Sequence, residues 1–313
     1  MRGHVVKEDC SHRLPVLCTQ SAPVSNASFS DASPRFQVSQ QVGGQEVTGY
    51  RDFFSFHFLG IRYAPQPKRF GYSTVYEGTG NVMALEQPKK CLQPDVVDPG
   101  SEDCLFLNVF TPSLPLTATS KNGTSGAAKG GSKGKAVMLW IYGGAFLTGS
   151  INDTNTDGTN LASRGDVVVV ELNYRLGNLG FLALDDGTTN GNYGLGDLIT
   201  GLEWVNKNIA SFGGDPDRVT IFGESAGAAA VYALLASPAA KGLFAGAVME
   251  STPGGVGANG PYTKWQTIPA EMARVGNAVL NATGCLNATS KVDCLRALDA
   301  EALVNVPVTA IAK

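Results

Sequence analysis

Histidine is scarce in this chain of 313 residues, which holds three: His4, His12 and His57. Charge is scarce too, with 16% charged residues and a formal net charge of −3. Its basic stretch at 129–135 is short, so nucleic acid is not expected as a partner. No apolar run is long enough to predict a membrane span.

The six cysteines contain no C-x-x-C signature of a metal site, and we expect neither a metal nor a cofactor. They fall instead into three local pairs: Cys10 with Cys18, Cys91 with Cys104, and Cys285 with Cys294. Five N-x-S/T sequons accompany them, at Asn26, Asn122, Asn152, Asn281 and Asn287. Paired cysteines beside several glycosylation sequons indicate a secreted protein.

The N-terminus lacks the apolar region of a signal peptide. Either the leader is missing from this chain or the protein is not exported, and we favour the first interpretation. Residues 1–33 are rich in Ser, Pro and Asn and predict a poorly ordered appendage. Cys10 and Cys18 within it are compatible with a small disulfide loop or with two unrelated thiols.

Residues 34–313 predict a folded domain, since 43% of the chain is hydrophobic and its length allows one large α/β core. Alternating apolar residues predict edge strands at 36–47 and 51–58, and prolines predict an extended crossing loop at 58–70. The low-complexity stretch 113–135 predicts a flexible surface loop.

Strand and helix patterns then alternate along the chain. Apolar runs predict strands at 105–110, 136–141, 166–172, 219–222 and 244–250. Helical spacing predicts helices at 196–209, 228–236, 270–280 and 294–304. This alternation predicts a doubly wound α/β fold whose central sheet is mostly parallel and flanked by helices.

The most informative stretch is 218–236, RVTIFGESAGAAAVYALLA. A β-branched strand leads into Gly-Glu-Ser-Ala-Gly, and an alanine-rich helix follows. This context turns G-x-S-x-G into a nucleophile elbow, in which side chains larger than glycine near the serine would clash. An incidental serine in a glycine-rich loop is the alternative, but the flanking strand and helix favour Ser225 as a nucleophile.

A second glycine turn, YGGAF at 142–146, follows the strand at 136–141. Paired glycines leave backbone N–H groups uncovered, and such groups are natural donors to an oxyanion. An ordinary turn would have the same composition, and the elbow downstream favours the oxyanion role.

Five motifs in order resemble the type-B carboxylesterase family, the cholinesterase-like branch of the α/β-hydrolases. They are EDCLFLNVF at 102–110, YGGAF at 142–146, NYRLGNLGF at 173–181, and FGGDPDRVTIFGESAGA at 212–228 with its GESAG at 223–227. The similarity runs from about residue 34 to the C-terminus. It implies the α/β-hydrolase fold and a serine hydrolase that cleaves small-molecule or lipid carboxylic esters through an acyl-enzyme.

The resemblance implies roles for single residues. Ser225 would be the acylated nucleophile, and the backbone N–H groups of Gly143, Gly144 and Ala226 would form the oxyanion hole. Glu224 resembles a buried acid of the family beside the serine; a solvated glutamate in a turn is the alternative.

Further positions match the family in part. Ser251 follows a strand where the family often has a serine that supports the triad. Asp197 matches a family aspartate that we expect to be structural, and Leu198 stands where the family usually has glutamine. The resemblance also implies two disulfides, Cys91–Cys104 and Cys285–Cys294. The first of these loops contains no aromatic residue, so choline specificity is not expected.

The catalytic base has no candidate. In the family an acid and then a histidine follow the serine, whereas all three histidines here precede Ser225. We expect His57 to point outward from a strand. Acidic residues after the serine lie in predicted helices, and none is nominated: Glu271, Asp293, Asp299 and Glu301.

We therefore expect the N-terminal portion of a longer esterase, truncated at the C-terminus, with little turnover by the 313 residues alone. Two alternatives are a non-catalytic binding or adhesion relative and an inactive truncated gene product. Retention of Ser225 and of both oxyanion glycines argues against the first alternative.

Overall fold

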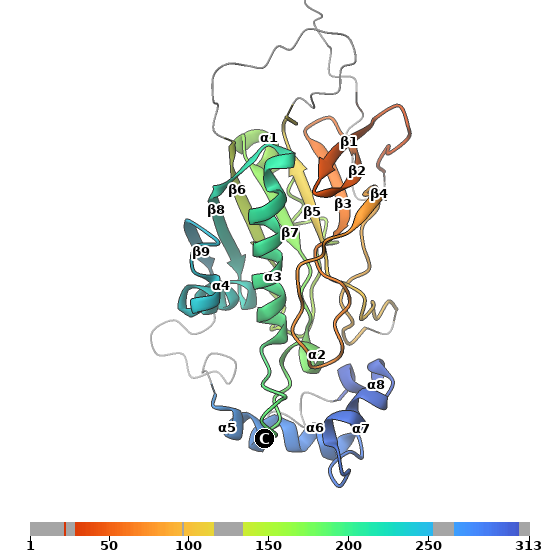
Figure 1. Ribbon diagram of the computed structural model, residues 1–313, viewed down its shortest axis with the longest axis vertical. Helices are drawn as coiled ribbons and strands as arrows, with labels where there is room; N and C mark the ends of the chain where they lie inside the picture. The colour runs from red at the N-terminus through yellow and green to blue at the C-terminus, as the bar shows by residue number, and fades with distance from the viewer. Residues whose placement is uncertain (1–21, 23–28, 96, 116–133, 253–265, 307–313) are drawn as a thin grey trace, which may run out of the picture.

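The computed structural model describes residues 22, 29–95, 97–115, 134–252 and 266–306 (Figure 1). A nine-stranded sheet runs in the order β1-β2-β3-β5-β7-β6-β8-β9, and β4 pairs with β2. The strands are β1 Gln37–Val42, β2 Gly44–Arg51, β3 Phe56–Arg62, β4 Thr79–Met83, β5 Phe106–Thr111, β6 Lys135–Ile141, β7 Val168–Leu172, β8 Gly214–Glu224 and β9 Gly246–Glu250.

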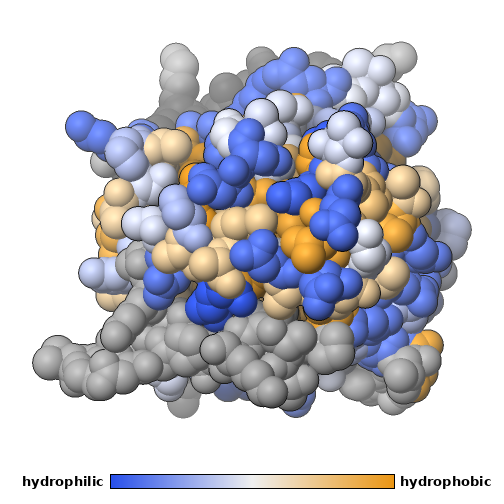
Figure 2. All heavy atoms as spheres, turned by 90° about the horizontal axis from the view of Figure 1, so that it is seen from below, coloured by the Kyte–Doolittle hydropathy of each residue, from blue (hydrophilic) through white to orange (hydrophobic). Residues whose placement is uncertain are grey.

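The α-helices are α1 Thr159–Gly165, α2 Gly177–Phe181, α3 Tyr193–Asn208, α4 Ala226–Ala236, α5 Ile268–Glu271, α6 Asn277–Ala282, α7 Lys291–Ala297 and α8 Ala300–Val304. Figure 1 shows α3 along the front of the sheet and α5 to α8 gathered at one end of the molecule. Figure 2, the view onto that end, shows polar side chains spread among smaller apolar patches.

The sheet is mixed. Its pairs are antiparallel from β1 through β2, β3 and β5 to β7, and parallel from β7 through β6 and β8 to β9. The expected parallel, helix-flanked architecture therefore describes the second half of the sheet, which carries the elbow.

The N-terminal strands differ from the sequence prediction. The predicted strand at 36–47 is a hairpin that turns between β1 and β2, and residues 58–62, predicted as loop, belong to β3. Alternation of apolar residues continues across a tight hairpin turn and so does not reveal it. The prolines at 65 and 67 lie after the end of β3 and do not interrupt it.

Helices cover the two faces of the sheet unequally. Helices α3 and α4 pack on one face and bury Leu139, Ile141 and Ile221 completely. On the other face α1 packs against β5 and β7. Beyond α1 that face is more open: Trp140 and Phe222 are half-buried, and Val248 is 43% exposed.

His57 does not point outward into solvent, contrary to the expectation from sequence. Its side chain is buried, because β3 lies inside the sheet and α1 covers that face. Its Nδ1 lies 3.1 Å from the Tyr50 hydroxyl and its Nε2 lies 3.1 Å from the Thr159 hydroxyl. Burial lowers the pKa of His57, while the carboxylates of Asp157 and Asp52 act in the opposite direction.

The C-terminal helices are shorter than predicted. The segment predicted as one helix at 270–280 runs through α5, a π-helical stretch at Met272–Gly276, and α6. The segment at 294–304 divides into α7 and α8, because the Asp299 carboxylate caps a new helix by accepting the N–H of Glu301.

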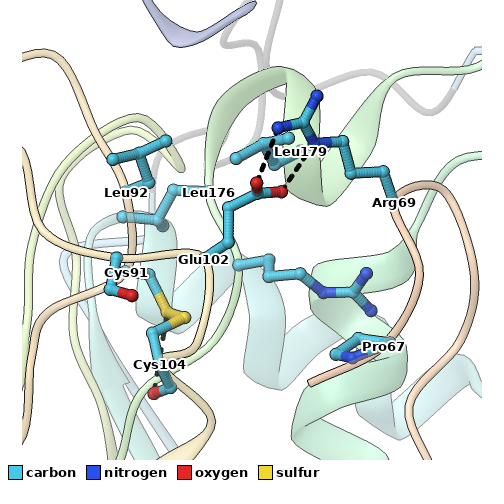
Figure 3. A pocket seen from close by; sticks show the side chains of 10 residues that line it. Pro67, Arg69, Cys91, Leu92, Glu102, Cys104, Leu176 and Leu179 are labelled. Carbon is cyan, nitrogen blue, oxygen red and sulfur yellow. Dashed lines mark hydrogen bonds and ion pairs between the residues drawn. A yellow bond between two sulfur atoms is a disulfide. The ribbon is translucent and has the colours of Figure 1, made fainter. Parts of the chain in front are cut away.

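Both disulfides implied by the resemblance are present, Cys91–Cys104 and Cys285–Cys294. Arg69 connects the first of these disulfide loops to the end of α7. Its guanidinium donates to both carboxylate oxygens of Glu102 at 2.7 Å, and to the carbonyl of Leu298 after α7 at 2.6 Å. A pocket with room for about one water molecule lies between this ion pair and the first disulfide (Figure 3).

Several predictions fall on residues that the structure does not describe: His4, His12, Cys10, Cys18, Asn26, Asn122 and most of the 113–135 loop. The appendage at 1–33 therefore stays a prediction. In the described part of the chain, no helix is long and apolar enough to cross a membrane. Within the same residues, no three His, Cys, Asp or Glu side chains are placed to hold a metal ion.

Replacing Arg69 tests its role as the connection between the first disulfide loop and the end of α7. We expect Arg69→Ala to lower the free energy of unfolding by about 2 kcal/mol, because it leaves Glu102 and the carbonyl of Leu298 without their charged donor. Amide hydrogen exchange should rise in α7 and α8. The control Arg274→Ala removes an ion pair between residues three apart on the helix and should cost about 0.5 kcal/mol or less. Equal exchange in the two variants would contradict this role.

The buried His57 predicts a dependence of stability on pH. Because its pKa is lower in the folded chain than the ordinary 6.5, the unfolded chain binds a proton first on acidification. Stability should therefore fall as pH decreases from about 6.5, by at most about 1.4 kcal/mol per pH unit. Urea unfolding of His57→Gln should show a smaller slope between pH 6.5 and 5; an unchanged slope would assign the effect to other groups.

Candidate active site

Ser225 sits at a sharp junction between strand and helix. β8 ends at Glu224, α4 begins at Ala226, and Ser225 has φ 54° and ψ −118°. Few non-glycine residues adopt such a backbone, and it persists where neighbours hold it. Its N–H donates to the carbonyl of Glu250 at 2.9 Å, and its carbonyl accepts the N–H of Ala229 at 3.0 Å. The side chain is partly exposed, as a nucleophile requires.

The glycines on either side of the serine allow two chain segments to touch. A Cβ at Gly227 would lie 2.0 Å from the carbonyl oxygen of Ile141, at the end of β6. A Cβ at Gly223 would lie 2.6 Å from the backbone of Gly227. The steric argument made from the G-x-S-x-G pattern is thereby confirmed for both glycines.

The second glycine turn lies directly against the elbow. A Cβ at Gly143 would come within 3.1 Å of the Ser225 Cβ and within 2.8 Å of the Glu224 carbonyl. The N–H groups of Gly144 and Ala145 donate to no acceptor among the described residues. Gly144 has φ 102° and Ala145 has φ 57°, so this turn is held in an unusual conformation beside the serine.

Ala145 was missed by the sequence analysis, which selected the two glycines because they lack side chains. An uncovered amide depends on backbone direction as well as on side-chain size, and the left-handed conformation of Ala145 has no signal in composition. Ala226, in the first turn of α4, supplies a further free N–H group, because this group has no acceptor within the helix.

The two supporting residues are more open than the resemblance implied. Glu224 is exposed, although its Oε2 would lie 2.9 Å from a Cβ at Gly143. It is therefore not a buried acid in the described chain, because nothing there covers the end of β8. Ser251 is also exposed, with φ 51°, and directly follows the Glu250 carbonyl that holds the N–H of Ser225.

The turn at 142–146 packs against the segment at 173–175, Asn-Tyr-Arg. The rings of Tyr142 and Tyr174 stack with centroids 4.5 Å apart, and each hydroxyl donates to the other residue's carbonyl, at 3.2 and 2.8 Å. Burial raises the pKa of both tyrosines well above 10, so both stay donors. The sequence analysis missed this pair, although each tyrosine follows the end of a predicted strand by no more than two residues.

Asp197 is structural, as expected. It is completely buried on α3 and accepts two hydrogen bonds from the Arg175 guanidinium, at 2.7 and 2.8 Å. Leu198, in the place of a family glutamine, is buried in the core under the sheet. The ion pair between Arg175 and Asp197 anchors the segment at 173–175 to α3.

No histidine of the described chain lies at this site. His57 belongs to the separate polar cluster beneath α1 described above, with Tyr50 and Thr159 as its partners. The described residues thus place a partly exposed serine beside a turn whose amides donate to no acceptor among them, and no histidine of the described chain lies there.

The mixed sheet, the strand-to-helix elbow and the adjoining glycine turn define an α/β-hydrolase fold. A solved structure titled thermophilic pnb esterase superposes with a TM-score of 0.72 and 35% identity, covering 87% of this chain and 53% of that one. The model of the carboxylesterase family matches residues 38–312. The chain belongs to the carboxylesterase family.

The chain is similar to curated proteins named as an esterase, a lipase and a neuroligin. The para-nitrobenzyl esterase of Bacillus subtilis is 40% identical over 242 residues, 75% of this chain and 45% of that protein. The bile salt-activated lipase of Bos taurus is 38% identical over 258 residues, 79% and 40% of the two chains. Neuroligin-3 of Mus musculus is 39% identical over 214 residues, 65% and 25% of the two chains. The chain thus spans less than half the length of each of these relatives.

Replacing a glycine of the elbow tests the contact with β6. Gly227→Ala should destabilise the fold by about 3 kcal/mol or more, since its Cβ would collide with a backbone carbonyl that has little room to move. Gly165→Ala is the matched control, because a Cβ there meets its nearest atom at an ordinary 3.4 Å. Chemical denaturation compares the two; similar midpoints would show that the elbow tolerates a wider separation.

Proposed function

We propose that this chain carries the nucleophilic half of a carboxylic ester hydrolase. The observation that supports it best is the strained seat of Ser225, which touches a glycine turn with free amides. The Ser225 Oγ attacks the ester carbonyl carbon and gives up its proton to a base. The oxygen anion of the tetrahedral intermediate accepts hydrogen bonds from Gly143, Gly144 and Ala226, to which Ala145 adds a fourth amide.

The second half of the reaction follows the same geometry. The intermediate collapses, the alcohol leaves with the transferred proton, and the acyl group stays on Ser225. Water then attacks the acyl carbonyl through a second oxyanion held by the same amides, and the carboxylic acid is released. The exposed Glu224 and Ser251 lie where they can order water or support the base.

The base is proposed to be none of the three histidines in this sequence. His4 and His12 precede the folded domain, and His57 has both ring nitrogens occupied away from the site. Without a base and its orienting acid, oxyanion binding alone supplies only a small part of the rate. We therefore expect the 313 residues by themselves to turn over esters slowly, as the N-terminal portion of a longer hydrolase would.

The proposed substrates are small-molecule or lipid esters without a quaternary ammonium group. The names of the relatives point to nitrobenzyl esters and to lipids, while the loop between Cys91 and Cys104 offers no aromatic face for a cation. We also propose that the protein is secreted, because two disulfides are formed and such bonds persist in oxidising compartments.

A binding or adhesion function is the second candidate, since neuroligin-3 is among the relatives. Here Ser225 keeps the strained backbone, and the amides of Gly144 and Ala145 donate to no acceptor among the residues that the structure describes. Such strain costs about 1–3 kcal/mol and serves no purpose in a surface used only for docking. We therefore favour ester hydrolysis.

Covalent labelling separates the two candidates. A fluorophosphonate probe should label the chain slowly with one equivalent at Ser225, because the amides stabilise the anionic adduct even without a base. Ser225→Ala should lose the label, because it removes the hydroxyl that forms the adduct. Peptide mapping by mass spectrometry locates the adduct. No labelling, or labelling that survives Ser225→Ala, would remove the support for a nucleophile.

A further inference from the structure

The N-x-S/T sequons have no part in the proposed hydrolysis, and the structure separates them into two kinds. Three of the five lie in the described chain, at Asn152, Asn281 and Asn287. Asn281 and Asn287 are exposed, whereas Asn152 is only partly so. The difference matters because an N-linked glycan is bulky and solvated and must remain in water after folding.

Asn152 is built into the interior. Its Nδ2, the atom that would carry a glycan, donates to the carbonyl of Pro88 at 2.8 Å, and its Oδ1 is shielded from solvent. The preceding Ile151 is 2% exposed and donates its N–H to the Asn173 Oδ1 at 3.2 Å. A sugar on Nδ2 would have to displace this packing between the 85–93 segment and β7.

In contrast to Asn152, Asn281 and Asn287 are both exposed at the surface. Asn281 lies in the last turn of α6, and Asn287 lies beyond the buried Cys285. Neither carboxamide makes a hydrogen bond within the described chain. Thr283, the third residue of the first sequon, turns its hydroxyl to the carbonyl of Val279 at 2.7 Å, so the helix end stays ordered without the asparagine side chain.

We propose that Asn281 and Asn287 carry N-linked glycans on either side of the Cys285 end of the second disulfide, and that Asn152 does not. The donor is an oligosaccharide linked to a lipid pyrophosphate. The Nδ2–C1 bond forms, the bond between C1 and the phosphate oxygen breaks, Nδ2 loses one proton, and the lipid pyrophosphate leaves. This inference rests on the secretion part of the proposed function and not on the hydrolytic part.

The two glycans would keep one end of the molecule in water. Helices α5 to α8 gather there (Figure 1), and Arg69 is the connection that ties α7 to the first disulfide loop. Another protein could cover a surface that carries two glycans so close together only by displacing those glycans.

Mapping of site use tests the proposal. The full chain, with a cleavable leader and with Asn26→Gln and Asn122→Gln in the background, is expressed in a eukaryotic secretory host. Thr154→Ala, Thr283→Ala and Thr289→Ala each remove one sequon and keep the asparagine. The folded, trypsin-resistant fraction is compared on gels before and after peptide N-glycosidase, and sites are located by incorporation of ¹⁸O on deglycosylation.

We expect Thr283→Ala and Thr289→Ala each to remove one glycan and Thr154→Ala to remove none. Thr283→Ser keeps the sequon and the hydroxyl and should keep the glycan. A glycan at Asn152 in the folded fraction, or unmodified Asn281 and Asn287, would overturn the proposal. If a variant does not fold, translation into microsomes reports transfer to Asn281 and Asn287 on the nascent chain with the same two readings.

The hydrolytic proposal is tested apart from this one. Ser225→Ala should leave the glycan pattern unchanged, and removal of glycans should leave the labelling of Ser225 unchanged. Failure of either proposal therefore leaves the other standing.

Discussion

The whole site depends on a backbone contact with no side chain in it. The Cα of Gly227 lies so close to the carbonyl of Ile141 that a methyl group does not fit between them. This contact brings the first turn of α4 against the end of β6. It thereby places Ser225 beside the turn that begins at Gly143. Parallel pairing of β6 with β8 makes the contact possible, because both strands end at the same edge of the sheet.

A second layer of interactions holds that edge in position. Two stacked tyrosines fix the end of β6 to the end of β7, and the buried ion pair of Arg175 with Asp197 fixes the same loop to α3. A buried pair of this kind adds little net stability, but removal of one partner leaves an uncompensated charge and is costly. The arrangement therefore fixes direction more than it adds energy. Backbone amides that are already oriented need no reorganisation when an anion forms beside them.

Ser225 and the glycine turn beside it follow adjacent strands of the parallel region, at one edge of the sheet. The histidine of the folded domain lies on a different strand, among buried hydroxyl groups, where its role is to connect β2 and β3 with α1. The open stretch of sheet at Phe222 and Val248 and the exposed Glu224 lie on β8 and β9. β8 is the strand that leads into the elbow, and β9 is its neighbour in the sheet.

The sequence by itself determined the features that are local in the chain. These features are the placement of Ser225 between two glycines, the apolar runs of β6, β7 and β8, and the two short disulfide loops. Each is visible within a few tens of residues, and the resemblance to a family indicated that they belong to one fold. Only the tertiary structure decided which groups are buried. His57 is covered by α1, about a hundred residues later in the sequence, and Asn152 is held by the carbonyl of Pro88. Whether a residue is buried depends on what packs on it from elsewhere in the chain, so no sequence pattern around His57 or Asn152 could predict it.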